Sequence, residues 1–260
     1  MSPRLDERST RHVYEFDAEH TISHDYCWNG SVSEQRFEPL LKRLAKLAQR
    51  GKLLDVGCGG GHFLQAAKKL GLWQLTGLEP IASAAMQAAS YTGCGVRDTT
   101  LEEANFADGS FQVITMLGVL EHLHDPQSAL IQARKLMTPS GMLGIYVPNY
   151  NYLRLKDTGL LSYAKNRRWS QLHPQEHLFQ FQPTTLRRLL ESAGFEIVRL
   201  DMGRPFIHGS QIKRHLKQAA YQGLNGLYVV TGFHFGGLEV IARLKPQAVT
   251  CGIEPLKLAS

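Results

Sequence analysis

A glycine-rich turn that follows an acidic residue is the part of this sequence best suited to chemistry. Asp55 ends a short apolar run, and Gly57, Gly59 and Gly61 follow at alternate positions before a helical pattern begins at Phe63. Glycine lets the backbone approach a ligand closely and permits a positive φ. The first turn of a helix presents unpaired N–H groups to a polar or anionic ligand. The turn therefore predicts a ligand-binding loop.

A second acid stands at the end of the next predicted strand. Glu79 comes 24 residues after Asp55, a spacing that fits a strand–helix–strand unit whose second strand offers a carboxylate to a ribose diol. The pyrophosphate-binding pattern G-x-G-x-x-G fails, because its last glycine falls on His62 or Leu64. A nicotinamide-dependent oxidoreductase is therefore the weaker alternative.

Alternating strand and helix patterns surround this loop. Short apolar runs predict strands, and amphipathic or alanine-rich stretches predict the helices between them. The predicted strands are 52–57, 74–79, 95–97, 111–116 and 142–147, and the predicted helices are 33–49, 63–70, 80–89 and 126–137. This alternation is typical of an α/β protein with a doubly wound, mainly parallel sheet and helices on both faces.

Length and composition agree with a globular protein. The 260 residues can bury one large α/β core with an elaboration, and 43% of them are hydrophobic and 20% charged. The first 20 residues contain no apolar signal segment, and no run approaches the roughly 18 apolar residues of a membrane span. The four cysteines are scattered without a C-x-x-C pair, which disfavours a disulfide framework and favours a cytoplasmic location.

Several blocks after the second acid match one family in the same order. They are Phe106–Phe111, Leu117–Pro126, Leu136–Gly141, His177–Phe181 and Leu186–Phe195. With the acid-x-Gly-x-Gly-x-Gly loop, they resemble class I S-adenosylmethionine-dependent methyltransferases, in particular the ubiquinone-biosynthesis-like branch of small-molecule O-methyltransferases. The resemblance covers about residues 33–202, with a looser match to a final strand at about 236–244. It implies a Rossmann-like seven-stranded sheet whose final strand is antiparallel.

The resemblance also implies a site for S-adenosylmethionine. The implied cofactor-binding residues are Arg36, Asp55, Gly57, Gly59, Gly61, Glu79, Thr100 and Leu117. The loop would lie under the methionine portion, and Glu79 would accept hydrogen bonds from both ribose hydroxyls. Arg36 matches an arginine that pairs with the cofactor's carboxylate, and its alternative is an ordinary surface arginine. Thr100 stands where many relatives have an aspartate for the adenine amino group, and Leu117 would lie against the adenosine or sulfonium region.

Methyl transfer from a sulfonium needs alignment and, for a hydroxyl acceptor, a base. Candidate bases follow the fourth strand or lie in the insertion after the fifth strand: Glu121, His122 and His124, and His173, Glu176 and His177. We select His177 and His122 as the candidate catalytic residues. Their alternative roles are to anchor the hydrophobic segment after His177 and to brace the turn at His122. No metal site is expected, because Pro174 interrupts a helix between His173 and His177.

The predicted domain organisation has three parts. They are an arm or lid at 1–32, a methyltransferase domain at 33–245 with acceptor-side insertions at about 150–182 and 203–235, and a tail at 246–260. Between Leu153 and Lys217, 12 Lys/Arg stand against 5 Asp/Glu, which suits an anionic acceptor, a phospholipid surface or a solvated helical face. The basic amphipathic stretch 212–221 and its apolar continuation predict a packed hairpin, a peripheral membrane patch or a lid over an apolar acceptor.

The expected function is methyl transfer from S-adenosylmethionine to a small-molecule or lipid-linked acceptor, with a hydroxyl as the preferred group. The alternatives are C- or N-methylation of a small molecule or nucleic acid, and a non-catalytic regulatory protein that binds the cofactor. Nucleic acid is disfavoured, because no Asp/Asn-Pro-Pro-Tyr/Phe segment follows the fourth strand. A cytoplasmic enzyme with peripheral membrane contact fits these expectations, and the oligomeric state is not predicted.

Overall fold

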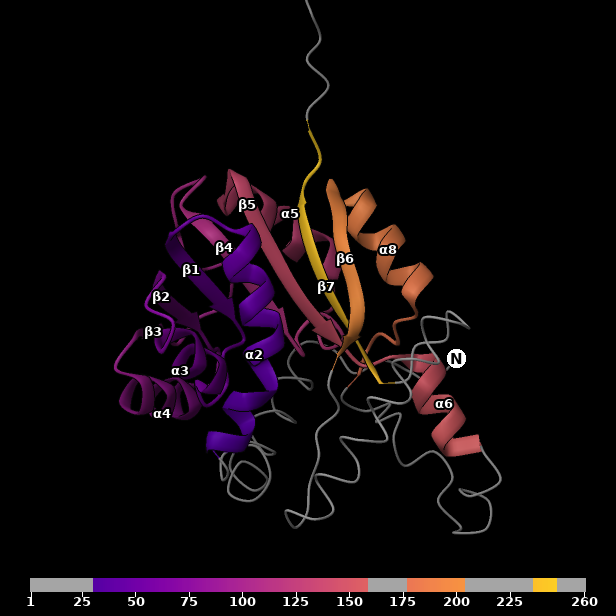
Figure 1. Ribbon diagram of the computed structural model, residues 1–260, viewed down its shortest axis with the longest axis horizontal. Coiled ribbons are helices and arrows are strands. Elements are labelled where there is room, and N and C mark those ends of the chain that lie inside the picture. The colour runs from indigo at the N-terminus through magenta and orange to yellow at the C-terminus, as the bar shows by residue number, and fades with distance from the viewer. Residues whose placement is uncertain (1–29, 159–176, 204–235, 247–260) are drawn as a thin grey trace, which may run out of the picture.

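The computed structural model describes residues 30–158, 177–203 and 236–246, which include a seven-stranded sheet (Figure 1). The strands are β1 (Gly51–Val56), β2 (Trp73–Leu78), β3 (Gly95–Arg97), β4 (Phe111–Leu117), β5 (Met137–Val147), β6 (Phe195–Gly203) and β7 (Gly237–Leu244). Their order is β3-β2-β1-β4-β5-β7-β6. The first five strands pair in parallel, and β7 is antiparallel to β5 and β6. The predicted Rossmann-like sheet with an antiparallel final strand is confirmed.

Helices cover both faces of this sheet. The helices of the described residues are α2 (Gly30–Leu47), α3 (His62–Lys68), α4 (Ala82–Thr92), α5 (Pro126–Leu136), α6 (Tyr150–Thr158) and α8 (Pro183–Ser192), and α6 extends away from the sheet (Figure 1). Helices α2 and α3 pack on one face and α5 and α8 on the other, with an apolar cluster under each pair (Figure 1). Leu53 belongs to the first cluster and Leu54 to the second, as the two-residue period of a strand requires.

Two elements begin at least three residues before their predicted starts. Helix α2 begins at Gly30, three residues before the predicted helix at 33–49. Strand β5 begins at Met137, five residues before its predicted start. The segment that reads as a turn after the helix is an irregular first part of this strand, where pairing with β4 shifts register between Phe111 and Val113. A bulged strand and a turn share the same Pro-Ser-Gly composition, which explains the difference.

Several predictions concern residues outside the described ranges. They are the arm at 1–29, residues 159–176 and 204–235 of the insertions, and the tail at 247–260. His173 and Glu176 are among them. Within the part of the chain that the structure describes, no helix is long and apolar enough to cross a membrane. The domain division and the membrane contact stay predictions.

Leu130 and Ile131 on α5 provide a test of this layering, because Leu130 is fully buried and Ile131 is 37% exposed. Leu130→Ala should lower the free energy of unfolding by about 2–5 kcal/mol, since it removes apolar contacts and leaves a cavity. Ile131→Ala is the matched control and should cost less than about 1 kcal/mol. Urea unfolding of both variants measures the difference, and equal losses would contradict the placement of α5 on the sheet.

Candidate functional site

The glycine-rich loop joins β1 to α3 at the carboxyl end of the parallel strands. Gly57, Gly59 and Gly61 have φ values of 66°, 50° and 82°, which lie in the left-handed region that favours glycine. A Cβ on Gly57 would lie 2.6 Å from Cγ2 of Val119, whereas a Cβ on Gly59 would meet nothing within 4 Å. The loop is therefore packed tightly against the turn after β4 at its start and is open at its middle glycine.

Glu79, directly after β2, is bonded to this loop. Its two carboxylate oxygens accept hydrogen bonds from the N–H of Gly59 at 2.9 Å and the N–H of Ile81 at 3.1 Å. Each oxygen has a second lone pair, so the carboxylate can also accept the ribose hydroxyls of a bound cofactor. Burial raises the pKa of Glu79, and the two N–H donors oppose that rise. The open loop and the remaining acceptor capacity fit S-adenosylmethionine.

Asp55 has a different environment from Glu79. Its side chain is 2% exposed, and its Oδ1 accepts a hydrogen bond of 2.7 Å from the Thr115 hydroxyl on β4. Burial raises the pKa of Asp55 to about 7, the Thr115 hydrogen bond opposes this shift, and the charge of Glu79 adds to it. Asp55 thus links β1 to β4 below the loop and titrates near neutral pH.

The other implied cofactor residues come from three separate elements. The Arg36 guanidinium carbon on α2 lies 4.6 Å from the ring centroid of Tyr146 and 5.2 Å from that of Phe37. Leu117 ends β4 and lines a small cavity together with Arg36 and Tyr146. Thr100 is half-buried in the segment after β3. The structure therefore brings Arg36 and Leu117 together at the end of β4.

The two candidate catalytic histidines lie against one another. The ring centroids of His122 and His177 are 4.9 Å apart, and the rings are inclined by 68°. The Nε2 atom of His122 lies 4.0 Å from Oε1 of Glu121. The Phe179 N–H donates a 3.0 Å hydrogen bond to the Glu121 carbonyl, which holds the segment that carries His177 against the turn after β4. We call Glu121, His122 and His177 the post-β4 cluster.

Glu121 is the most buried member of the post-β4 cluster. Its side chain is 3% exposed, and its Oε2 has no hydrogen-bond partner among the described residues. Burial raises the pKa of Glu121 to about 8, while a backbone hydrogen bond and the positive charge of Arg36 oppose the rise. Glu121 therefore carries a proton at neutral pH. The charge of Arg36, one of the implied cofactor residues, therefore acts on the post-β4 cluster.

The post-β4 cluster has the donor set of a cation site. One ligand atom from each of its three residues lies within 4.8 Å of the others, and neutral imidazoles with a carboxylate are ligands for zinc and related ions. A bound ion would require Glu121 to lose its proton, so metal binding and protonation compete here. The sequence predicts no metal site and offers His173 as the metal-ligand partner of His177, whereas the structure places His177 beside His122.

Three site residues are not singled out by the sequence pattern. Thr115 donates to Asp55, Val119 fills the space beside Gly57, and Tyr146 lies under Arg36. A threonine and a tyrosine in buried strands are ordinary sheet residues by composition. The only sequence signal for Tyr146 is its position near the end of a predicted strand. Ligand-binding residues of parallel sheets lie at the carboxyl ends of the strands.

The chain matches a known family over most of the described fold. Residues 32–200 match the model of a methyltransferase domain, and the solved structures of similar fold include S-adenosylmethionine-dependent methyltransferases. The chain therefore belongs to the methyltransferase-domain family, and it has the fold of the solved S-adenosylmethionine-dependent methyltransferases. The predictions of family, enzyme class and cofactor are confirmed.

Individual relatives either match less than half of this chain or are distant in sequence. The ubiquinone biosynthesis O-methyltransferase of Pectobacterium atrosepticum is 34% identical over 134 residues, 45% of this chain and 55% of the relative. That of Pseudomonas aeruginosa is 35% identical over 106 residues, 38% and 45% of the two chains. The chain thus spans about half the length of these curated relatives. The 1,6-didemethyltoxoflavin-N1-methyltransferase of Burkholderia thailandensis, solved with S-adenosylhomocysteine, shares the fold with a TM-score of 0.62, 16% identity and coverage of 94% and 93%.

The raised pKa of Asp55 predicts a pH-dependent effect of Asp55→Asn. The ordinary pKa is 3.8 and the folded value about 7, so the unfolded state loses its proton first and wild-type stability falls as pH rises between these values. The amide keeps an acceptor for Thr115 and cannot ionise. As pH rises from about 4 to about 8, the free energy of unfolding of Asp55→Asn should therefore increase by roughly 2–4 kcal/mol relative to that of the wild type. Urea unfolding across this range measures it, with the exposed Asp98→Asn as control, and a difference independent of pH would refute the assignment.

Loss of the Glu79 carboxylate should weaken cofactor binding. Glu79→Ala should reduce the affinity for S-adenosylhomocysteine by about 1–3 kcal/mol, because a charge-assisted acceptor is lost. Calorimetric titration measures the change, and Glu102→Ala, an exposed acid after β3, should leave the affinity near the wild-type value. Unchanged binding by Glu79→Ala would remove Glu79 from the cofactor site.

Proposed function

We propose that this chain transfers a methyl group from S-adenosylmethionine to a hydroxyl group of a small-molecule or lipid-linked acceptor. The observation that carries the proposal is the contact between His122 and His177 at the turn after β4, with ring centroids 4.9 Å apart, beside the cofactor loop. A positioned imidazole is the usual base for a hydroxyl group. The names of the partial relatives, ubiquinone biosynthesis O-methyltransferases, support the choice of oxygen.

The cofactor-binding residues hold and orient S-adenosylmethionine, and Arg36 pairs with its carboxylate. S-adenosylmethionine, when bound, supplies a methyl group on a positively charged sulfur, which is an activated leaving group. The glycine loop and Glu79 fix its position relative to the end of β4. Much of the remaining barrier is then lowered by alignment of the acceptor oxygen with the methyl group.

The post-β4 cluster handles the proton. A neutral imidazole of His122 or His177 accepts the hydroxyl proton as the oxygen attacks, and the second ring lies close enough to share the resulting positive charge. Glu121 is protonated at neutral pH because burial raises its pKa to about 8, so it does not hold the histidines permanently in their charged form. The histidine side chain at 122 is 23% exposed, which leaves it accessible to an acceptor.

The acceptor is proposed to be anionic or linked to a lipid. The excess of 12 Lys/Arg over 5 Asp/Glu between residues 153 and 217 would attract a negatively charged acceptor or a phospholipid surface. This part of the chain begins shortly after β5, and ligands of such sheets bind beyond the carboxyl ends of the parallel strands. Contact with a membrane surface belongs to the same proposal and rests on the same charge excess.

The test measures formation of S-adenosylhomocysteine with a panel of acceptors. The panel contains phenolic hydroxyls with and without a carboxylate and with and without a prenyl chain, and the corresponding amines. His122→Gln and His177→Gln should lower kcat by about 10²–10⁴-fold if the pair acts as base, with cofactor affinity within about threefold of wild type.

The exposed His124 provides the matched control, and His124→Gln should keep wild-type activity. Transfer to amines but not to hydroxyls would exclude O-methylation. Full activity of both His122→Gln and His177→Gln would exclude the base assignment. Tight cofactor binding without transfer to any acceptor would favour the regulatory alternative.

A further inference from the structure

Four residues in register form a row across the sheet on its α2 face. Leu117 on β4 lies beside Tyr146 on β5, Tyr146 is opposite Glu239 on β7, and Glu239 is opposite Asp201 on β6. Residues in register point to the same face of a sheet. Leu117, Tyr146 and Glu239 line one cavity together with Arg36 of α2, which identifies that face.

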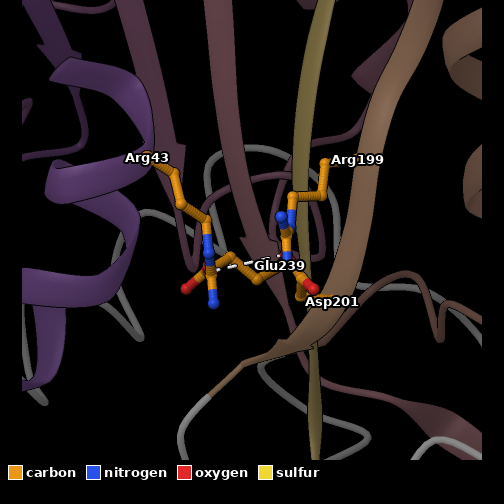
Figure 2. A network of polar contacts seen from close by, with 4 residues as sticks. All are labelled: Arg43, Arg199, Asp201 and Glu239. Carbon is orange, nitrogen blue, oxygen red and sulfur yellow. Dashed lines mark hydrogen bonds and ion pairs between the residues drawn. The ribbon is translucent and has the colours of Figure 1, made fainter. Parts of the chain in front are cut away.

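Ion pairs fix α2 to the far end of this row. Figure 2 shows Arg43 of α2 reaching Glu239 on β7, with Asp201 and Arg199 of β6 beside them. Arg43 pairs with Glu239, and its Nη1 lies 3.4 Å from Oδ2 of Asp201. Glu239 is 8% exposed, so salt screens this pair less than a surface pair. Arg36 lies seven residues, or about two helical turns, before Arg43.

The Tyr146 ring rests on a pair of glycines. Gly203 on β6 and Gly237 on β7 are in register. A Cβ on Gly203 would lie 2.3 Å from a ring carbon of Tyr146, and a Cβ on Gly237 would lie 2.5 Å from ring atoms and the hydroxyl. The ring therefore lies across β7 towards β6, in a space that a larger residue at either glycine would occupy.

The Arg36 guanidinium lies over this ring, 4.6 Å from its centroid. An aromatic face attracts a guanidinium through its quadrupole. The Arg36 side chain also makes a hydrogen bond with the Tyr146 hydroxyl, which opposes the raised pKa of Tyr146. The charge of Arg36 opposes the raised pKa values of both Tyr146 and Glu121, so it acts on the ring and on the post-β4 cluster.

We propose that Tyr146 is a positioning residue that holds Arg36 at the Leu117 end of the row, where the guanidinium pairs with the carboxylate of the bound cofactor. The inference rests on the pairing of Arg36 with that carboxylate in the proposed function. Without the ring, the arginine keeps its charge and loses its defined place, because a long side chain has many rotamers. The expected result is a selective loss of affinity for the amino-acid part of the cofactor.

Two ligands separate this role from a general structural one. S-adenosylhomocysteine carries the amino-acid part, and 5′-methylthioadenosine lacks it. In calorimetric titrations, Tyr146→Leu should weaken S-adenosylhomocysteine about tenfold and leave 5′-methylthioadenosine within about twofold. Tyr146→Phe keeps the ring and loses the hydroxyl that bonds Arg36, so it should weaken S-adenosylhomocysteine less than Tyr146→Leu does and leave 5′-methylthioadenosine within about twofold of wild type. An equal loss of affinity for both ligands in Tyr146→Leu, or unchanged affinity for both, would overturn the proposal.

Arg36→Ala completes a double-mutant cycle. It should weaken S-adenosylhomocysteine selectively, and adding Tyr146→Leu should cause no further loss, whereas a second loss of about tenfold would overturn the positioning role. Gly203→Ala displaces the ring and retains Tyr146, so it should reproduce the selective loss even if Tyr146→Leu does not fold. No acceptor is present in these titrations, so a failure of O-methylation leaves them unaffected. Normal S-adenosylhomocysteine binding by Arg36→Ala would overturn both this inference and the assigned pairing.

Discussion

The carboxylate of Glu79, held between the N–H groups of Gly59 and Ile81, is the interaction on which the site depends. A glycine-rich loop has few side chains to fix its shape, and glycine loses more backbone entropy than other residues when it is ordered. Charge-assisted hydrogen bonds from one buried acid supply part of the missing constraint. They connect the loop after β1 to the end of β2, so a ligand meets a loop that is already shaped and the ordering cost of binding is reduced.

This arrangement concentrates buried acids at one end of the sheet. Asp55, Glu79 and Glu121 follow or end three neighbouring strands, and burial raises the pKa of each. Such groups lower stability unless hydrogen bonds or opposite charges compensate. Thr115 compensates for Asp55 and two backbone N–H groups for Glu79, whereas a backbone hydrogen bond and the charge of Arg36 act on Glu121. The Oε2 atom of Glu121 has no hydrogen-bond partner among the described residues, and this acid lies beside the two histidines, in an environment typical of sites that handle protons.

Local patterns were sufficient for the parts of the site that are contiguous in the chain. The glycine loop and Glu79 lie within one strand–helix–strand unit, and the predicted strand at 52–57 differs by one residue from β1. The start of β5 was missed, because a bulged strand has the composition of a turn. The contact of His122 with His177 and that of Arg36 with Tyr146 join positions far apart in the chain, and they depend on strand order. A single sequence shows the residue types there and not their proximity.

The place of Arg36 is decided by the strand pair at the other end of the sheet. Burial of Leu40 and Leu44 attaches α2 to the sheet, but apolar contact alone specifies weakly how far a helix is shifted along its axis. The ion pair of Arg43 with Glu239 limits the shift of α2 along its axis. Buried charges fix the register of packed elements in some other proteins in the same way.

Strands β6 and β7 repeat the same two features on the α2 face: a glycine at the Tyr146 ring and an acid near Arg43. Residues two apart on a strand point to the same face. The space for the Tyr146 ring and the acid near Arg43 are therefore neighbours on each strand, as Gly237 and Glu239 on β7 and as Gly203 and Asp201 on β6. The antiparallel strand that interrupts the doubly wound pattern thus provides both supports for the arginine at the end of β4.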